Sequence, residues 1–247
     1  MPKKYFWLLL LALSLTLTSI ILYFVHYLLF KDIHHIFLYL IGDIAFLPVE
    51  VMLVSLIIER ILNRREKEVR LDKLNMIIGT FFSELGNKLI ELLSKHDTSI
   101  TTVIPYLKIN NSWDKKEFNN ALNFIKNYKG KILIKHEEIN SFKEELINKR
   151  DFMLRLLENQ NLLEHESFTD LLMSIFHLIE ELLIRDNIYN YSENDLSHLN
   201  LDINRVYSYI IKEWLNYNYY LKKNYSYLFS LAVRTNPFNE DACVFIK

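Results

Sequence analysis

Two apolar runs near the N-terminal end constrain this chain more than any other feature. Residues 5–30 carry no charged side chain, and only His26 among them could titrate. A second apolar run covers residues 36–58 after a short polar break. A helix needs about 20 apolar residues to cross the hydrocarbon core of a bilayer. Both runs meet this length, so we expect residues 1–62 to form a transmembrane hairpin of two helices.

The first run has a second interpretation, because a basic start such as Lys3 and Lys4 is also found in secretory signal peptides. The apolar region of a signal peptide is only about 7–15 residues long and precedes a small-residue cleavage site. The run over residues 5–30 is longer, and no such site follows it. We therefore predict an anchor that stays in the protein.

The charges that flank the two runs predict the orientation of the hairpin. A group of basic residues follows the second run: Arg60, Arg64, Arg65, Lys67 and Arg70. In the turn between the runs, Lys31 is offset by Asp32. Cytoplasmic flanks of membrane helices are enriched in Lys and Arg. The pattern predicts a multi-pass protein of the cell (inner) membrane with both termini in the cytoplasm.

The second run contains two carboxylates and a helix breaker, in the stretch GDIAFLPVEV at residues 42–51. Asp43 and Glu50 are one heptad apart and lie on nearly the same face of a helix. A charged side chain near the bilayer centre costs about 2.5–3.5 kcal/mol on insertion scales. Gly42 permits a second helix to approach closely, and Pro48 leaves one backbone carbonyl without its usual partner. The stretch therefore predicts a special role inside the membrane.

A polar ladder of His35, Tyr39 and Asp43, spaced at one helical turn, leads into this face from the outer surface. One interpretation is a proton or cation path, or a substrate site, lined by the ladder and Glu50. The other is that the acids are protonated, or hydrogen-bonded to hydroxyls of the first run, and only hold the hairpin together. These hydroxyls belong to Ser14, Thr16, Thr18 and Ser19. Either way the polar face should contact protein rather than lipid, which predicts a homo-oligomer with the second helices lining its axis.

Beyond the membrane runs, the composition favours long helices, since the chain has only 4 Gly and 4 Pro residues. Apolar residues there recur at three- and four-residue steps. The predicted fold class is all-α, a two-helix transmembrane hairpin followed by a cytosolic helical bundle. The cytosolic domain is expected over residues 63–247. It should consist of a long helix over 63–96, a loop over 97–113, a bundle over 114–234 and an extended tail over 235–247. The long helix is expected to be weakest at Gly79 and Gly86.

Local signals predict individual elements of the bundle. Helices are expected over residues 114–128, 137–159 and 199–221. The stretch SFTD at residues 167–170 has the form of a capping box and predicts another helix start. The stretch KGKILIKHE at residues 129–137 could be a strand, but no partner strand is evident, so we expect a loop or a helix start.

Several classes of function find no support in the sequence. The formal net charge of −1 argues against a nucleic-acid partner. The lone Cys243 cannot form a disulfide within one chain. The chain contains no Gly-rich phosphate loop, no G-x-S-x-G and no H-E-x-x-H. We therefore expect a protein that is not an enzyme, with no catalytic residues and no cofactor.

Histidines beside acids are the remaining candidates for a metal site. They are His136 beside Glu137 and Glu138, His165 between Glu164 and Glu166, and His177 near Glu180 and Glu181. Di-metal helical bundles use Glu-x-x-His twice, whereas the order at residues 177–180 is reversed and has no second copy. We therefore predict no metal site and expect His177 to bond to a neighbouring carboxylate. His34 and His35 could bind a metal at the outer surface of an oligomer, but an interfacial position is the favoured interpretation.

The chain resembles, over most of its length, a family of uncharacterised short prokaryotic two-span membrane proteins with a cytosolic helical domain. The resemblance rests on the stretches FLYLIGDIAFLPVEV, LDKLNMIIGTFFSELG, RDFMLRLLENQNLLEHESFTDLLMSIFHLIEEL and NYSYLFSLAVRTNPF. It implies the same two-part organisation. It implies no activity, cofactor or site.

Two functions from different classes remain. The preferred one is a homo-oligomeric membrane protein that tethers a cytosolic helical interaction or sensor module. Its expected partners are the lipid bilayer, further copies of the chain, and a cytosolic protein or small ligand. The alternative is an oligomeric channel or transport-type protein in which Asp43 and Glu50 line a cation or proton path.

Overall fold

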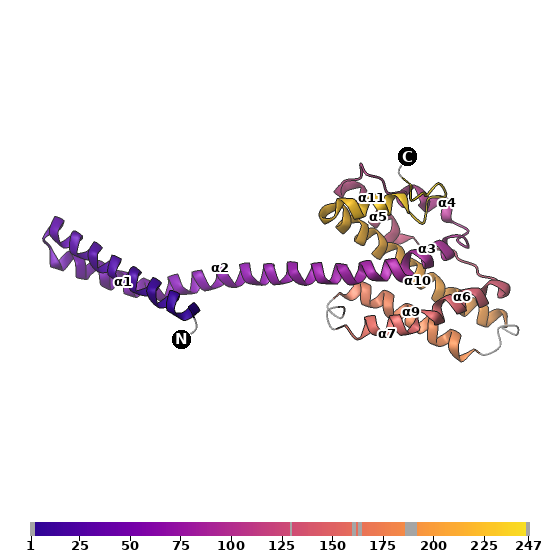
Figure 1. Cartoon of the computed structure of the whole chain (residues 1–247), viewed down its shortest axis with the longest axis horizontal. Helices are drawn as coiled ribbons and strands as arrows, with labels where there is room; N and C mark the ends of the chain where they lie inside the picture. Colours follow the sequence, from indigo (N-terminus) through magenta and orange to yellow (C-terminus); the bar gives the residue numbers. More distant parts are fainter. Residues whose placement is uncertain (1–2, 129, 160–161, 163–164, 186–191, 246–247) are drawn as a thin grey trace. The chain divides into compact units, whose positions relative to one another are not determined.

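The computed structural model describes residues 3–128, 130–159, 162, 165–185 and 192–245, with all their side chains except those of residues 3–5, 136 and 137. Helices make up nearly all the regular structure of these residues (Figure 1). The β structure among them is one isolated antiparallel bridge between Asp97 and Ile132. The predicted all-α fold class is confirmed.

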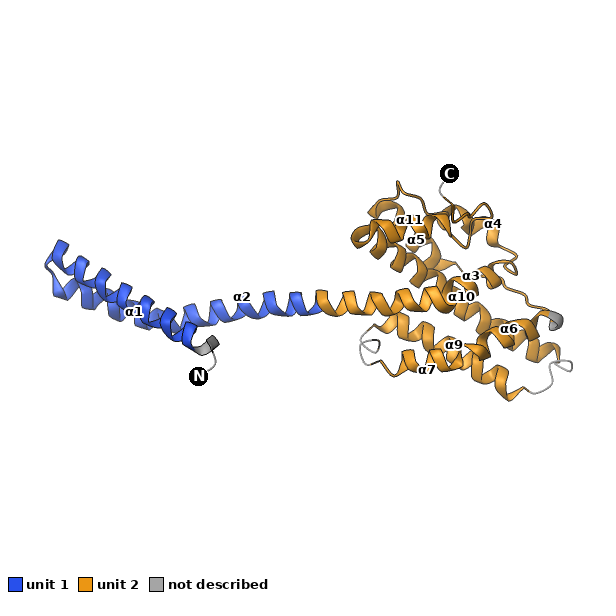
Figure 2. Cartoon of the chain, viewed as in Figure 1, with its two compact units in different colours: residues 1–67 blue, residues 68–247 orange. Residues whose placement is uncertain are grey.

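The chain divides into two compact units, residues 1–67 and residues 68–247 (Figure 2). The division falls a few residues after the expected boundary at residue 62. It lies inside the helix α2, Ile33–Phe81, rather than in a linker. The reason is that the apolar run passes into an amphipathic pattern without a Gly or Pro that would end the helix.

The first unit contains α1, Lys3–Phe30, and the first part of α2. Only Lys31 and Asp32 separate the two helices, and Lys31 adopts a positive φ of 51°. The carboxylate of Asp32 accepts hydrogen bonds from the backbone N–H groups of His34 and His35, at 2.9 and 3.2 Å. Asp32 therefore caps the start of α2, and the chain reverses its direction within this short turn (Figure 1).

Both helices are long and apolar enough to cross a membrane, over Phe6–Phe30 and within Ile33–Ser94, and no part of either apolar window is buried. Their large apolar side chains are exposed; the side chain of Trp7, for example, is 76% exposed. The helix α2 continues through Pro48, although proline cannot donate the backbone hydrogen bond of a helix interior. In the described part of the chain, the apolar windows of these two helices are not buried against any protein core.

In the second unit, α2 ends in a π-helical turn over Phe82–Gly86, and α3 follows over Asn87–Ser94. The helix does not break at Gly79; the register changes at the π turn instead. Both Phe81 and Phe82 are buried, at 0% and 2% exposure. A Cβ on Gly86 would lie 2.6 Å from a ring carbon of Phe82, so the close approach of this ring requires glycine at Gly86.

The expected loop over residues 97–113 contains a short helix, α4, Ile100–Val103, and a 3-10 turn, Ile104–Tyr106. The side chains of Val103 and Leu107 are fully buried. Burial of these two apolar residues orders the segment as helical turns, which local composition did not predict.

The bundle is organised around one long central helix, α10, which packs against α9, α5, α11 and α3 (Figure 1). Two further helices, α6 and α7, pack on α9. The helices of the bundle are α5 Lys115–Asn127, α6 His136–Asn148, α7 Arg150–Leu157, α9 Glu166–Ile184, α10 Glu193–Asn224 and α11 Ser226–Arg234. The largest fully buried side chains are Tyr207, Phe81, Phe82, Phe118, Phe168 and Phe229.

Of the helix starts of α5, α9 and α10, one agrees with the sequence signal, although all three caps are local. Asp114 caps α5 and forms a capping box with Glu117, near the expected start. The α9 helix begins before SFTD, because the ring of His165 accepts from the backbone N–H of Phe168 at 3.3 Å; Ser167 is inside the helix. Ser192 caps α10 through its hydroxyl, which starts that helix earlier than expected.

The single helix expected over residues 137–159 is two helices that meet at Lys149. The backbone N–H of Lys149 bonds to the carbonyl of Leu146 at 3.1 Å, which closes α6 with a tight turn. Its ammonium group lies 3.2 Å from the carboxylate of Glu84. This tertiary ion pair has no signal in the local sequence.

Within the segment KGKILIKHE, residues 130–135 form no regular strand, and α6 begins at residue 136. The segment makes one isolated antiparallel bridge, in which Thr98 N–H donates to the carbonyl of Lys131 at 3.1 Å and Leu133 N–H to the carbonyl of His96 at 3.3 Å. Ile132 exchanges two hydrogen bonds with the side-chain amide of Asn204, at 2.9 and 3.0 Å. The backbone N–H of Ile134 donates to Asn200 at 3.0 Å. Two asparagines on α10 thus bond to backbone groups of the segment that the bridge does not use, while the side chains of Ile132 and Ile134 enter the core.

The C-terminal tail was expected to be extended. It instead folds back as turns up to residue 245. The side-chain amide of Asn236 donates to the carbonyl of Leu107 at 2.8 Å. Phe238 is buried, with its ring edge-on to Trp214 at a centroid distance of 5.3 Å. A polar anchor and an aromatic anchor therefore attach the tail to the bundle.

Candidate functional site

The predicted polar ladder is present on α2 in the first unit. The rings of His35 and Tyr39 lie 4.7 Å apart between centroids. Asp43 and Glu50 are both exposed, and neither makes a hydrogen bond or ion pair with another described residue. The ladder therefore presents two unpartnered carboxyl groups along one apolar helix.

The opposite helix adds a residue that the sequence interpretation did not include in the ladder. The ring of His26 on α1 stacks on that of His35, with centroids 5.8 Å apart and an interplanar angle of 14°. The Nε2 atom of His26 is buried without a hydrogen-bond partner. Its position as the lone titratable residue of the first apolar run was the available signal.

Three of the four hydroxyls that one interpretation paired with the acids bond to their own helix instead. Ser14, Thr16 and Thr18 donate to backbone carbonyls three or four residues earlier in α1, at 2.8–2.9 Å. A Cβ on Gly42 would meet no atom within 4 Å. Within one chain, therefore, α1 supplies neither the hydrogen bonds to the acids nor the close helix contact at Gly42.

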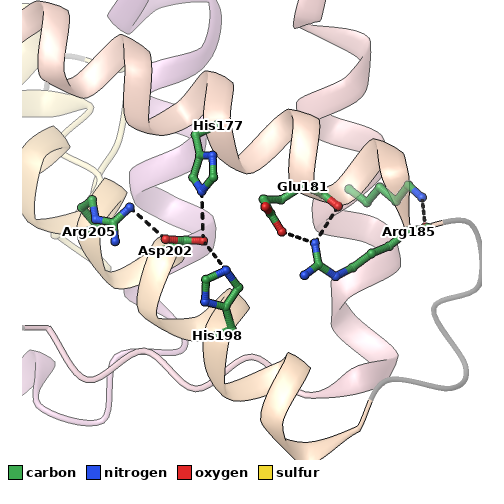
Figure 3. Close-up of polar contacts among 7 residues, drawn as sticks. His177, Glu181, Arg185, His198, Asp202 and Arg205 are labelled. Carbon is green, nitrogen blue, oxygen red and sulfur yellow. Dashed lines mark hydrogen bonds and ion pairs between the residues drawn. The ribbon is translucent and has the colours of Figure 1, made fainter.

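A second cluster lies in the bundle, between α9 and α10 (Figure 3). The carboxylate of Asp202 on α10 is its centre. The Nε2 atoms of His177 on α9 and His198 on α10 each lie 3.5 Å from the same oxygen, Oδ2. Arg205 approaches the other oxygen, with Nη1 at 2.9 Å from Oδ1. Two imidazoles and one guanidinium thus converge on a single carboxylate.

The members of this cluster differ sharply in burial. The side chain of Asp202 is 2% exposed, whereas those of His177 and His198 are 48% and 53% exposed. Neither oxygen of Asp202 accepts a hydrogen bond from a described residue. The buried negative charge of Asp202 is therefore compensated by the ion pair with Arg205 and by the two nearby imidazoles.

Acidic and basic side chains surround the cluster on the α9 side. Glu181 accepts from the guanidinium of Arg185, and Lys143 donates to the backbone carbonyl of Arg185 at 2.9 Å. The hydrogen bond from Arg185, and to a smaller extent the charges of His177 and His198, hold the pKa of Glu181 below its usual value. Glu181 therefore stays ionised within the electrostatic reach of both imidazoles.

The sequence interpretation of His177 is partly corrected by this geometry. Its carboxylate partner is Asp202 on the next helix, not Glu180 or Glu181. Glu180 pairs with Arg150 at 3.2 Å. His198 and Asp202 were missed, although both pairs, His177 with Glu181 and His198 with Asp202, have the four-residue spacing that places two side chains on one helix face.

The other histidine candidates do not converge. His96 lies 3.4 Å from the carboxylate of Glu138, and His165 caps α9. The side chains of His136 and Glu137, and residue Glu164, lie outside the described residues. Among the side chains that the structure describes, no group of three or more His, Cys, Asp or Glu is arranged around one point as metal ligands.

A cleft of about 910 Å³ lies in the second unit between α3, α4 and the folded tail. Lys88 and Lys95 on its wall both pair with Glu91, at 3.6 and 2.9 Å. The wall also includes Ser83 of the π turn, and π-helical turns are frequent at functional sites. The cleft has the size of a small-ligand site, and its lining mixes these paired charges with apolar residues such as Ile100, Ile104 and Phe238.

Both parts of the chain match models of known protein domains. Residues 3–62 match the model of the N-terminal helical domain of MJ1433, and residues 70–234 match that of the C-terminal helical domain of the uncharacterized protein MJ1433. The protein of that name from Methanocaldococcus jannaschii is 42% identical over 242 residues, which cover 98% of this chain and 96% of the relative. No solved structure matches the chain.

Proposed function

We propose that this chain, which belongs to the MJ1433 family, tethers a cytosolic helical interaction or sensor module to the cell membrane. One observation carries the proposal: the apolar windows of two helices are entirely unburied, while the second unit has a core of its own. Soluble monomers rarely expose apolar patches larger than a few hundred Å². A lipid bilayer would cover the exposed apolar surface of both helices at once.

The way α2 is built supports a permanent tether rather than a removable leader. The helix runs from the second apolar stretch into Leu74, Ile78 and Phe81, which are part of the bundle core. An anchor and a core element are thus one continuous helix. Removal of the anchor by cleavage after α1 would leave the apolar part of α2 attached to the bundle.

The first test compares the full chain with residues 68–247. We expect the full chain to remain in the membrane fraction after an alkaline carbonate wash, and the shorter chain to be soluble and folded, because its core is internal to residues 68–247. Sedimentation and far-UV circular dichroism provide the readouts. A full chain that is released by carbonate would contradict the tether, and an insoluble shorter chain would contradict an independent module.

The same proposal includes both termini in the cytoplasm, which is supported by the basic flank after the second apolar run. Single cysteines at Lys31 and at Lys126, in a chain with Cys243→Ser, form a matched pair of exposed positions. A membrane-impermeant maleimide should label Lys31→Cys in intact cells and Lys126→Cys only after permeabilisation. The reverse pattern would overturn the orientation.

A second candidate function is favoured by the unpartnered carboxyl groups of Asp43 and Glu50. Since α1 leaves both acids without a hydrogen bond and leaves Gly42 open, partners have to come from further copies of α2 or from water. An oligomer in which the α2 helices surround an axis supplies both. In this arrangement Asp43 and Glu50 line a cation or proton path.

The variant Asp43→Asn with Glu50→Gln separates a path from simple packing. Neutral amides keep the size and hydrogen bonding of the acids, and interhelical polar contacts in membranes average only about 0.6 kcal/mol. We expect the oligomer to persist while ion or proton flux into reconstituted vesicles is lost. Flux that is unchanged in the double variant would exclude the path through these acids, and a monomer in nanodiscs would exclude the oligomer.

A further inference from the structure

We propose that a groove on α1 is the docking site for helix α2 of a second copy of this chain, with Gly42 and Asp43 of that copy against Ser19. The groove has a volume of about 410 Å³ and lies in the first unit. Its lining residues are Leu15, Thr18, Ser19, Leu22, Tyr23 and His26. The proposal rests on the membrane hairpin proposed above, and it names the face through which such hairpins associate.

The groove follows one face of a single helix. Its six lining residues recur at three- and four-residue steps, and all of them belong to α1. Thr18 and Ser19 are small, whereas leucine and tyrosine side chains stand on either side of them. Small residues at such a position allow two membrane helices to approach closely. The groove therefore suits a second helix, and α2 of the same chain contributes no lining residue to it.

The depth of the groove in the hairpin matches that of the polar ladder on α2. The stacked rings of His26 and His35, with centroids 5.8 Å apart, mark a level that the two helices share. Seven residues further from the turn, about 10.5 Å along each helix, lie Ser19 on α1 and Gly42 on α2. Copies related by a cyclic axis along the membrane normal have equal levels. Gly42 and Asp43 of one copy therefore lie at about the depth of Ser19 in the next.

The groups at this shared depth complement one another. Asp43 has no hydrogen bond or ion pair with another described residue. Of the four serine and threonine residues of α1, only Ser19 makes no side-chain hydrogen bond within the described chain. A hydroxyl can both donate and accept, so it can bond to a carboxyl group whether that group is ionised or protonated. A Cβ on Gly42 would meet no atom within 4 Å, which leaves this side of α2 open to the groove.

The end of the groove near the turn contains a further group without a partner. The Nε2 atom of His26 is buried and has no hydrogen-bond partner among the described residues. The Cα–Cβ bonds of a helix tilt towards its N-terminus, so the side chain of Tyr39 leans towards the turn. In a neighbouring copy this direction brings the Tyr39 hydroxyl towards the level of His26. Tyr39 and Asp43 thus both meet polar atoms of the groove, whereas Glu50 lies beyond its end.

A lipid chain is the other occupant that a groove inside a membrane could take. Hydrocarbon tails offer no hydrogen bond to Ser19 or to Asp43, and ionisable side chains within membrane spans almost always face protein or water. These contacts therefore favour a second copy of the chain, and a lipid-filled groove is one of the outcomes that the test can reveal.

The test forms disulfides between copies of the full chain in native membranes. Chains with Cys243→Ser carry one new cysteine each, and two variants with different epitope tags are produced in the same cells. Ser19→Cys in one chain and Gly42→Cys in the other should give a heterodimer under mild oxidation, because a disulfide requires Cα atoms within about 7 Å of each other. Since each chain has a single cysteine, no bond within one chain can produce this band.

Two matched variants test the depth and the face of the contact. Val49 lies one heptad beyond Gly42 on the same face of α2, about 10.5 Å along the helix, so Val49→Cys should not bond to Ser19→Cys. Ile21 lies two residues from Ser19, on nearly the opposite face of α1, so Ile21→Cys should not bond to Gly42→Cys. Both side chains are exposed, and the oxidant can reach either position.

The outcomes separate this interface from the functions proposed above. A heterodimer of Ser19→Cys with Gly42→Cys, and loss of that band in both controls, supports the groove. Equal bands in all three pairs would overturn it. So would the absence of a band from a chain that is oligomeric in nanodiscs and resists the carbonate wash, which would leave the groove to lipid while tether and self-association stand. A monomer that still resists the wash would overturn the groove and the oligomer but not the tether.

Discussion

Replacement of Phe81 by alanine is expected to lower the free energy of unfolding of the second unit by about 3–5 kcal/mol. Phe81 is fully buried. Its ring meets Phe82 and Phe168 edge-on, at centroid distances of 5.2 and 5.3 Å. Alanine would leave a cavity at the junction of α2, the π turn and α9, where the aromatic rings cannot close together without moving the helices.

Denaturant unfolding followed by tryptophan fluorescence measures this loss, because Trp113 and Trp214 are both buried in the second unit. Met76→Ala is the matched control, since Met76 lies on the same helix but is 69% exposed; it should change the free energy of unfolding by less than about 0.5 kcal/mol. Equal effects of Phe81→Ala and Met76→Ala would show that α2 is not part of the bundle core.

Replacement of Asp97 by alanine is expected to cost the second unit about 3 kcal/mol. The buried carboxylate of Asp97 accepts from the backbone N–H and hydroxyl of Ser99, at 2.9 and 2.8 Å, and from the backbone N–H of Lys131 at 3.2 Å. It also accepts from the hydroxyl of Tyr128. Burial, and then the Asp97 carboxylate, raise the pKa of Tyr128, so this hydroxyl stays protonated and donates.

Through these hydrogen bonds, Asp97 links the α3–α4 connection to the segment after α5. Its loss leaves partly buried N–H groups without acceptors. Asp97→Asn keeps one acceptor oxygen and should fall between the parent and Asp97→Ala. The control is Asp170→Ala, an exposed acid on α9, for which the unfolding curve should not move. A change in the Asp97→Ala curve no larger than that control would mean that the segment is held by its other hydrogen bonds, those to Asn200, Asn204, His96 and Thr98, and not by Asp97.

The two sites differ in how far the sequence could predict them. The ladder of His35, Tyr39 and Asp43 follows from helical spacing, because all three residues are on one helix and their common face is set by 3.6 residues per turn. The addition of His26 needed the turn at Asp32, which brings the end of α1 beside the start of α2. The Asp202 cluster needed the packing of α9 on α10, and no local pattern tells which faces of two helices meet.

The same division explains the errors at element ends. Asp114 was a correct helix start because Asp114 and Glu117 form a capping box, whereas the equally local caps His165 and Ser192 were missed. The break at Lys149 was missed; the ion-pair partner of Lys149 there, Glu84, is distant in the sequence. The tail was expected to be extended because Asn236-Pro237 ends a helix, but the contacts of Asn236 and Phe238 with the bundle fold it into turns.

By itself, the sequence determined that this protein is helical, that two apolar helices precede an amphipathic bundle, and that two carboxyl groups lie on one face of the second apolar helix. These features follow from composition and periodicity, which act over one or two helical turns. Only the tertiary structure decided that His177 and His198 share Asp202, that asparagines of α10 hold the segment of Ile132 and Ile134, and that Phe81 closes the core. Each of these depends on which helix faces meet, and that choice is made by burying the whole apolar surface together rather than by any short stretch of residues.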